Sequence, residues 1–205
     1  MDIMLQEVVD DIKYFYELYI SVAFRFAVFT FLLSAVAGGL YIYWRRRWKN
    51  LVCLVFIKSA TLALLSAYAY IVVGITMLSR NEDYSDVVNL ELFSTFHDDY
   101  VSRKYIYENL MLLVPYAIIL YILAGVFRRA LVSLVMAILT SLLIEYAQMV
   151  THLGRFEVDD ILTNVTGYMA AYLMCCVVHD TCLLVRDIFA ILKKIIITIK
   201  NIMIK

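Results

Sequence analysis

The chain has 205 residues, and 64% of them are hydrophobic, against about 45–50% in a soluble globular domain. A soluble fold of this size cannot bury so much apolar surface, which excludes a cytosolic enzyme, a secreted module and a disordered chain. Charged residues make up 18%, and the formal net charge is zero, so no global basic field attracts nucleic acid.

Five stretches are long and apolar enough to cross the hydrocarbon core of a bilayer, which takes about 20 helical residues. They comprise residues 19–44, 51–78, 109–127, 130–150 and 161–179. Each is predicted to be helical, because lipid offers the backbone no other hydrogen-bond partner and the alternation of barrel strands is absent.

The last segment, residues 183–205, has a different pattern from the spans. Its polar side chains recur at seven-residue steps, as Arg186/Asp187, Lys193/Lys194 and Lys200/Asn201. This spacing predicts a basic amphipathic helix on the anionic inner leaflet. The expected fold class is therefore all-α: a polytopic membrane helix bundle with five transmembrane helices plus a C-terminal amphipathic helix.

The distribution of lysine and arginine predicts the orientation of the chain. Eleven basic residues and two acidic ones lie in three segments: the connection between spans one and two, the connection between spans three and four, and the C-terminal tail. The N-terminal segment and the other two connections hold five basic residues and fifteen acidic ones. Because basic residues collect on the cytoplasmic side, we predict a multi-pass protein of the cell membrane with its N-terminus outside and its C-terminus in the cytoplasm.

The connection between spans two and three and the start of span three carry further signals. Phe93, Phe96 and Tyr100 follow helical spacing, which predicts a helical segment at the membrane interface, although an ordinary aromatic belt explains them equally well. Pro115 is expected to free a carbonyl and to kink span three.

Polar side chains that a bilayer does not readily accept gather in spans four and five. Ser141, Glu145, Gln148 and His152 recur at helical spacing in span four. In span five Asp160 and Asn164 form a polar face that Gly167 and Ala171 continue as a face of small residues. A charged carboxylate facing lipid would cost at least about 2.5–3.5 kcal/mol, so the face that carries Glu145 must look toward protein or water. Arg155, in the short connection, is placed to pair with Glu145, Asp159 or Asp160, or with an anionic ligand.

Two of these segments resemble the VanZ-like family of small bacterial membrane proteins. They are Glu145-Tyr146-Ala147-Gln148 and the run GRFEVDDILTNVTG over residues 154–167, at this spacing between two spans. Weaker matches are TMLSR over 76–80, NLELF over 89–93 and NLMLLVP over 109–115. The resemblance implies that residues 51–180 form a VanZ-like four-helix transmembrane domain. Residues 1–50 would then be an N-terminal segment with an extra transmembrane helix, and residues 181–205 a basic amphipathic tail.

The resemblance also implies a set of site residues and a setting. The family's polar signature falls on Arg80, Asn109, Glu145, Gln148, Arg155, Asp160 and Asn164. The topology predicted without the family places all seven on the outer side of a bacterial cell membrane. The family's namesake is associated with resistance to the glycopeptide teicoplanin.

Three interpretations of this polar cluster are open. In the first, an outer-leaflet pocket binds or shields an anionic cell-envelope ligand, such as a lipid-linked cell-wall precursor or a lipoglycopeptide, with membrane lipids as the other partners. In the second, the protein is an intramembrane enzyme that modifies an envelope lipid or glycan, with Glu145 as the general acid or base and Arg155 stabilising negative charge. In the third, Glu145, Arg155 and Asp160 form a purely structural ion-pair network.

A metal centre would require Glu145, His152 and Asp160 to meet. Carboxylate and imidazole groups suit divalent ions, but the sequence contains no metal-binding motif of the HExxH kind. We therefore expect neither a metal nor another cofactor.

Overall fold

The computed structural model describes residues 19–45, 48–78, 88–96 and 100–203. In chain order the elements are α2 (Ser21–Arg45), α3 (Trp48–Val73), the π-helical turn η2 (Gly74–Leu78), β1 (Val88–Asn89), α4 (Tyr100–Leu112), α5 (Val114–Leu123), the 3-10 turn η3 (Gly125–Arg128), α6 (Ala130–Val150), β2 (Phe156–Glu157) and α7 (Val158–Met203). Four segments are long and apolar enough to span a membrane: Ser21–Trp44, Leu51–Leu78, Ser102–Leu123 and Ala130–Val150. The chain is thus an all-α, multi-pass membrane protein, and a fifth membrane helix stays a prediction.

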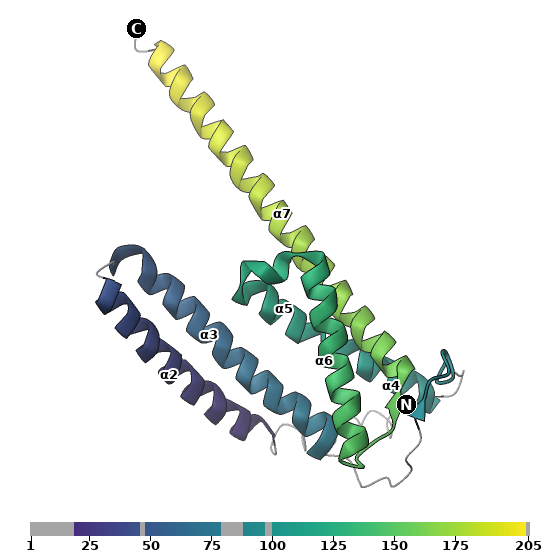
Figure 1. The fold of residues 1–205 in the computed structure, drawn as a ribbon. Helices are drawn as coiled ribbons and strands as arrows, with labels where there is room; N and C mark the ends of the chain where they lie inside the picture. The colour runs from purple at the N-terminus through teal and green to yellow at the C-terminus, as the bar shows by residue number, and fades with distance from the viewer. Residues whose placement is uncertain (1–18, 46–47, 79–87, 97–99, 204–205) are drawn as a thin grey trace, which may run out of the picture.

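The first two helices form a hairpin at the side of the molecule (Figure 1). α2 packs along α3, and Gly38 lies so close to Val55 that a side chain at Gly38 would collide with it. The rings of Phe31 and Phe56 meet edge to face, with centroids 5.6 Å apart. The most extensive contacts of the hairpin with the other helices run from α3 to α5, and η2 contacts α6.

The hydrophobic core lies between α5, α6 and α7. Its buried members are Leu113, Ala117, Leu120, Tyr121, Ala137, Ile144, Tyr168, Ala171 and Tyr172. Tyrosine rings of α7 meet those of α5 edge to face, Tyr168 with Tyr116 and Tyr172 with Tyr121. The Tyr172 hydroxyl donates to the Arg128 carbonyl over 2.8 Å, so this buried ring also satisfies its polar atom.

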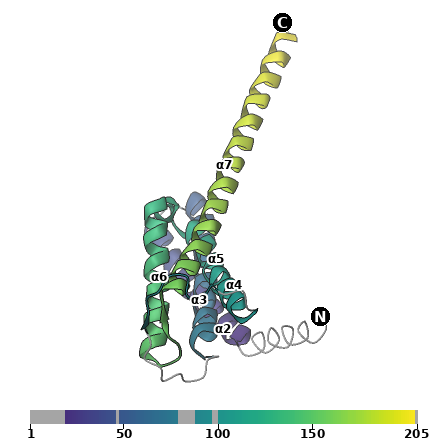
Figure 2. The same ribbon diagram turned by 90° about the vertical axis from the view of Figure 1, so that its right-hand side faces the viewer.

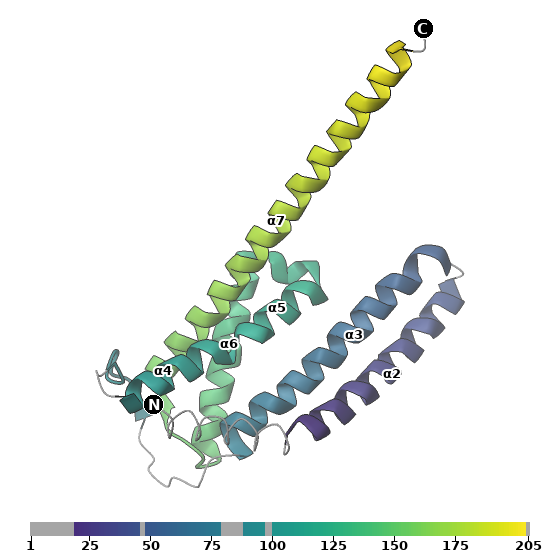
Figure 3. The ribbon, with the colours of Figure 1, turned by 180° about the vertical axis from the view of Figure 1, so that it is seen from behind.

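The third predicted span is two helices with a break at Leu113, which separates α4 from α5 (Figure 3). Pro115 follows the break by two residues, and its missing N–H and its ring disfavour a continuous helix, as predicted. The Tyr68 hydroxyl on α3 donates to the Leu112 carbonyl at this break. Our predicted start at Asn109 was wrong, because α4 begins at Tyr100 with a polar turn that includes the i,i+4 pair Lys104–Glu108 at 3.7 Å.

The last helix runs without a break from Val158 to Met203 and extends well beyond the other helices (Figure 2). The sequence predicted a span over 161–179 and a separate amphipathic helix from 183. No glycine or proline follows Gly167, so nothing in the sequence ends the helix between these two parts. The position of the basic tail on the inner leaflet stays a prediction.

Candidate functional site

The predicted polar face of α6 is confirmed for three of its four residues. Ser141, Glu145 and Gln148 are all buried, and Glu145 is only 2% exposed. The Gln148 amide donates to the Thr76 carbonyl over 3.0 Å, and one Glu145 oxygen accepts the Glu157 N–H over 3.2 Å. These bonds connect α6 to the end of the α2–α3 hairpin and to β2.

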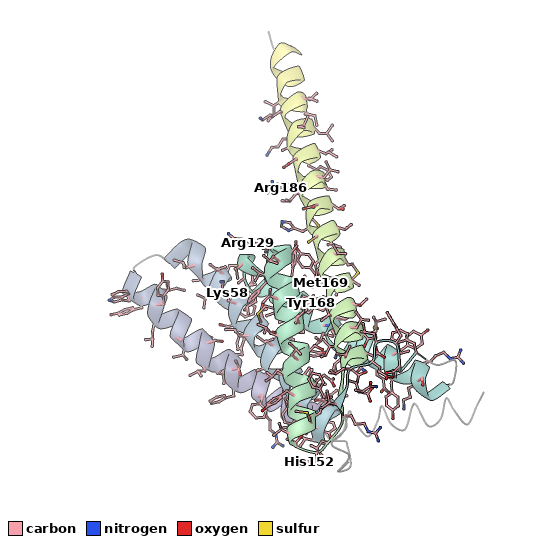
Figure 4. The ribbon with its side chains drawn as sticks, turned by 45° about the vertical axis from the view of Figure 1, so that its right-hand side comes forward. Lys58, Arg129, His152, Tyr168, Met169 and Arg186 are labelled. Atoms are coloured by element: carbon pink, nitrogen blue, oxygen red, sulfur yellow. The ribbon has the colours of Figure 1, made fainter. Side chains whose placement is uncertain are left out.

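His152 does not belong to this face, contrary to the prediction. α6 ends at Val150, and His152 is exposed in a left-handed conformation with φ 55°. The Leu153 N–H donates to the Gln148 carbonyl and the His152 N–H to the Met149 carbonyl, which is the Schellman arrangement that usually has glycine at the position of His152. Figure 4 shows His152 at one end of α6 and Arg129 at the other.

The N-terminal part of α7 supplies the opposite wall. Asn164 is 0% exposed, and its amide nitrogen donates to the Ser141 hydroxyl over 3.1 Å. The two helices run antiparallel here (Figure 1). One turn beyond the Ser141–Asn164 bond, toward the C-terminal end of α6, the corresponding residues are therefore Glu145 on α6 and Asp160 on α7. The amide oxygen of Asn164 is the one buried side-chain polar atom without a hydrogen-bond partner in the described part of the chain.

The remaining predicted site residues differ in how closely they approach this place. Asn109 is half-buried on α4. The carbonyl of the next residue, Leu110, lies so close to Gly167 of α7 that a side chain at position 167 would collide with this carbonyl. Arg155 is exposed, two residues before Glu157. Arg80 lies outside the residues that the structure describes.

Asp159 is the residue whose role the sequence did not reveal. It is 2% exposed, and its carboxylate accepts the Phe93 N–H over 2.7 Å, the Thr95 N–H over 2.9 Å and the Ser94 hydroxyl over 3.4 Å. Burial alone would raise the pKa of this carboxyl, but the hydrogen bonds from Thr95 and Phe93 outweigh it and lower the pKa below its usual value. Asp159 therefore fixes residues 93–95 against the start of α7.

Residues 88–96 form a short strand and a turn, so the helical conformation predicted from the spacing of Phe93 and Phe96 was wrong, whereas the position of this segment at the membrane interface stays a prediction. β1 pairs in parallel with β2, with Val88 opposite Phe156 and Asn89 opposite Glu157. The Thr95 hydroxyl also donates to the Glu157 carboxylate over 3.4 Å. Since the Glu157 N–H bonds to Glu145, Glu157 joins this turn to the polar face of α6.

The proposed metal ligands do not converge. No group of three histidine, cysteine, aspartate or glutamate side chains among the described residues is arranged to hold a metal ion. His152 is exposed beyond the end of α6, whereas Glu145 is buried and Asp160 is half-buried in the first turn of α7.

Comparison with known proteins gives one result that agrees with these features. A family model described as VanZ/LLP1 matches residues 64–179, which is more than half of the chain and includes every predicted site residue. No curated protein and no solved structure matches the chain. The matched range begins within α3 and ends within α7, so α2 lies outside it. The chain belongs to the VanZ/LLP1 family.

Proposed function

We propose that this VanZ/LLP1 protein binds or shields an anionic cell-envelope ligand in a polar pocket between α6 and α7, at the outer leaflet. The ligand class is a lipid-linked cell-wall precursor head group or a lipoglycopeptide. Arg80 and Arg155 would contact its anionic oxygens, and Glu145 and Asp160 would orient the arginines. By the family's association, this binding would contribute to teicoplanin tolerance.

The observation that carries the proposal is the buried amide oxygen of Asn164. The amide nitrogen of Asn164 donates to Ser141, and because the side chain is 0% exposed, its oxygen has no access to solvent. A buried acceptor that lacks a donor destabilises the fold by about 1–3 kcal/mol. Hydroxyl and amine groups of a glycan or peptide head group are donors of the required kind. A ligand that carries both donors and anionic oxygens matches both Asn164 and the arginines.

Asn164 and Ser141 provide a matched pair of variants. Asn164→Ala and Ser141→Ala both remove the hydrogen bond between α6 and α7, but only Asn164→Ala removes the free acceptor. Purified protein in lipid nanodiscs would be titrated with teicoplanin, a lipoglycopeptide probe. We expect Asn164→Ala to weaken its binding roughly 3- to 10-fold relative to Ser141→Ala, the worth of one hydrogen bond.

The control is thermal unfolding of both variants without the probe. Equal loss of binding in the two variants, in proportion to their loss of stability, would mean that Asn164 only holds the helices together. Absence of teicoplanin binding by the wild-type protein, with unchanged teicoplanin tolerance of cells carrying Glu145→Ala or Arg155→Ala at normal abundance, would reject this ligand class.

The burial of Glu145 favours one alternative, an intramembrane enzyme that modifies an envelope lipid or glycan. A carboxyl group that is 2% exposed within the membrane-spanning segment Ala130–Val150 is in the kind of environment in which acids and bases carry out proton transfer. Turnover of a labelled lipid-linked precursor by the purified protein, lost in Glu145→Gln while binding is retained, would favour this alternative over binding alone.

A further inference from the structure

Residues 90–96, which we call the apolar loop, present four large hydrophobic side chains to the surroundings. Leu90, Leu92, Phe93 and Phe96 are all exposed, Leu92 at 59% and Phe93 at 61%. The Phe93 and Phe96 rings meet at a steep angle, with their centroids 5.4 Å apart, so they form one continuous apolar surface. Glu91 is the one ionisable residue of the loop.

The loop is held in this form from its inner side. Phe93 has φ 65°, a conformation that is unfavourable for a bulky side chain and persists only where the surroundings impose it. The buried Asp159 carboxylate imposes it by accepting hydrogen bonds from both sides of the turn, at the Phe93 and Thr95 N–H groups. The polar atoms of the turn are thus directed inward, and the apolar side chains remain outside.

The apolar surface of the loop continues into the surface that the spanning helices present to lipid. α4 starts four residues after Phe96, and the membrane-spanning segment Ser102–Leu123 begins within its first turn. Tyr107 and Met111 on α4 are exposed, as expected for side chains in contact with acyl chains. In Figures 1 and 3 the loop lies beside the N-terminal end of α4, at the end of the molecule where α6 ends and α7 begins.

We propose that the apolar loop is a wedge that inserts into the acyl region of the adjacent leaflet and sets the depth of the polar residues behind it. The connection runs through Glu157, whose carboxylate accepts the Thr95 hydroxyl and whose N–H donates to Glu145. Insertion of the loop therefore fixes Glu145 just beneath the boundary between lipid and water. Asp159 is a positioning residue in this arrangement, and the inference does not require that Glu145 bind a ligand.

Tryptophan fluorescence in vesicles tests the insertion directly. Trp44 and Trp48 would be replaced by phenylalanine, and one tryptophan would be introduced as Leu92→Trp, or as Phe93→Trp in a second variant in case the first does not fold. The vesicles would contain phosphatidylglycerol and phosphatidylcholine with acyl chains brominated near the head group or near the chain end. We expect strong quenching by bromine near the head group, weaker quenching by bromine near the chain end, and protection from aqueous acrylamide.

Thr151→Trp is the matched control, because Thr151 is exposed in the polar turn after α6. That side chain should be quenched by acrylamide and little affected by brominated lipid. If the loop tryptophans behave like Thr151→Trp, the loop lies in water and the proposal is wrong. Protection from both quenchers would also overturn it, because the loop would then be covered by protein.

Asp159→Asn tests the role assigned to the carboxylate. An amide cannot accept from two N–H groups with both of its polar atoms, so the turn should lose its fixed form. Bromine quenching of the Leu92→Trp side chain should fall and acrylamide quenching should rise in this background, while the helical circular dichroism signal is unchanged. Retention of the full bromine quenching would show that insertion does not depend on Asp159.

Discussion

Replacing Gly167 by alanine should force α4 and α7 apart. The added methyl group would overlap the Leu110 carbonyl oxygen and would lie 2.7 Å from its carbonyl carbon, about 1 Å closer than carbon atoms pack without strain. The obstacle is backbone, so no side chain can rotate away. Overpacking of this kind costs about 1–3 kcal/mol, which lowers the midpoint of thermal unfolding by roughly 2–12 °C in a chain of this size.

Gly39 offers the matched control for this substitution. Gly39 lies within α2, in the membrane-spanning segment Ser21–Trp44, and a methyl group there would meet no atom within 4 Å. Gly39→Ala should therefore leave stability unchanged or raise it by about 0.4–1 kcal/mol, because alanine restricts the unfolded chain. Circular dichroism of both variants during heating in detergent measures the two midpoints. Equal midpoints for Gly167→Ala and Gly39→Ala would show that α4 and α7 do not approach each other as described.

Two further predictions concern buried polar contacts. The lowered pKa of Asp159 contributes stability that is fully present above the unfolded pKa of about 3.8 and is lost as pH falls through the folded pKa. The difference in unfolding midpoint between wild type and Asp159→Asn should therefore shrink as pH falls from about 5 to 3, and a difference that does not change with pH would contradict this. Gln148→Met leaves the Thr76 carbonyl without its donor and should reduce the free energy of unfolding by about 1–3 kcal/mol, measured by thermal unfolding. Thr166→Val is the control: it removes an exposed hydroxyl that bonds within its own helix, and it should have little effect.

The helices were predictable because hydrophobic stretches of membrane length leave the backbone few alternatives. The break near Pro115 was predictable for the same local reason, since proline lacks the N–H that a continuous helix needs. The continuity of α7 was not predicted, because we interpreted the change from an apolar to an amphipathic pattern at about residue 180 as a boundary. A change in which surface a helix presents does not interrupt its hydrogen bonds.

The candidate site was predictable where it depends on helical spacing and not where it depends on turns. Glu145, Gln148 and Asn164 lie on the expected faces, because side chains four residues apart share a face. His152 was misplaced, because a left-handed residue other than glycine gives no signal in the sequence. Asp159 was only one of three alternative partners for Arg155, and its bonds to Phe93 and Thr95 join segments more than sixty residues apart.

The unbroken last helix has a mechanical consequence. Its 24 residues from Asp180 to Met203 make a stiff arm about 36 Å long, on the same rod that carries Asp159 and Asn164 at its other end. A pivot of about 10° around the core tyrosines Tyr168 and Tyr172, which lie about 50 Å from Met203, would move the tip of this arm by roughly 8–9 Å. Any rearrangement that tilts α7 near Asn164 is thereby magnified at the far extremity of the chain.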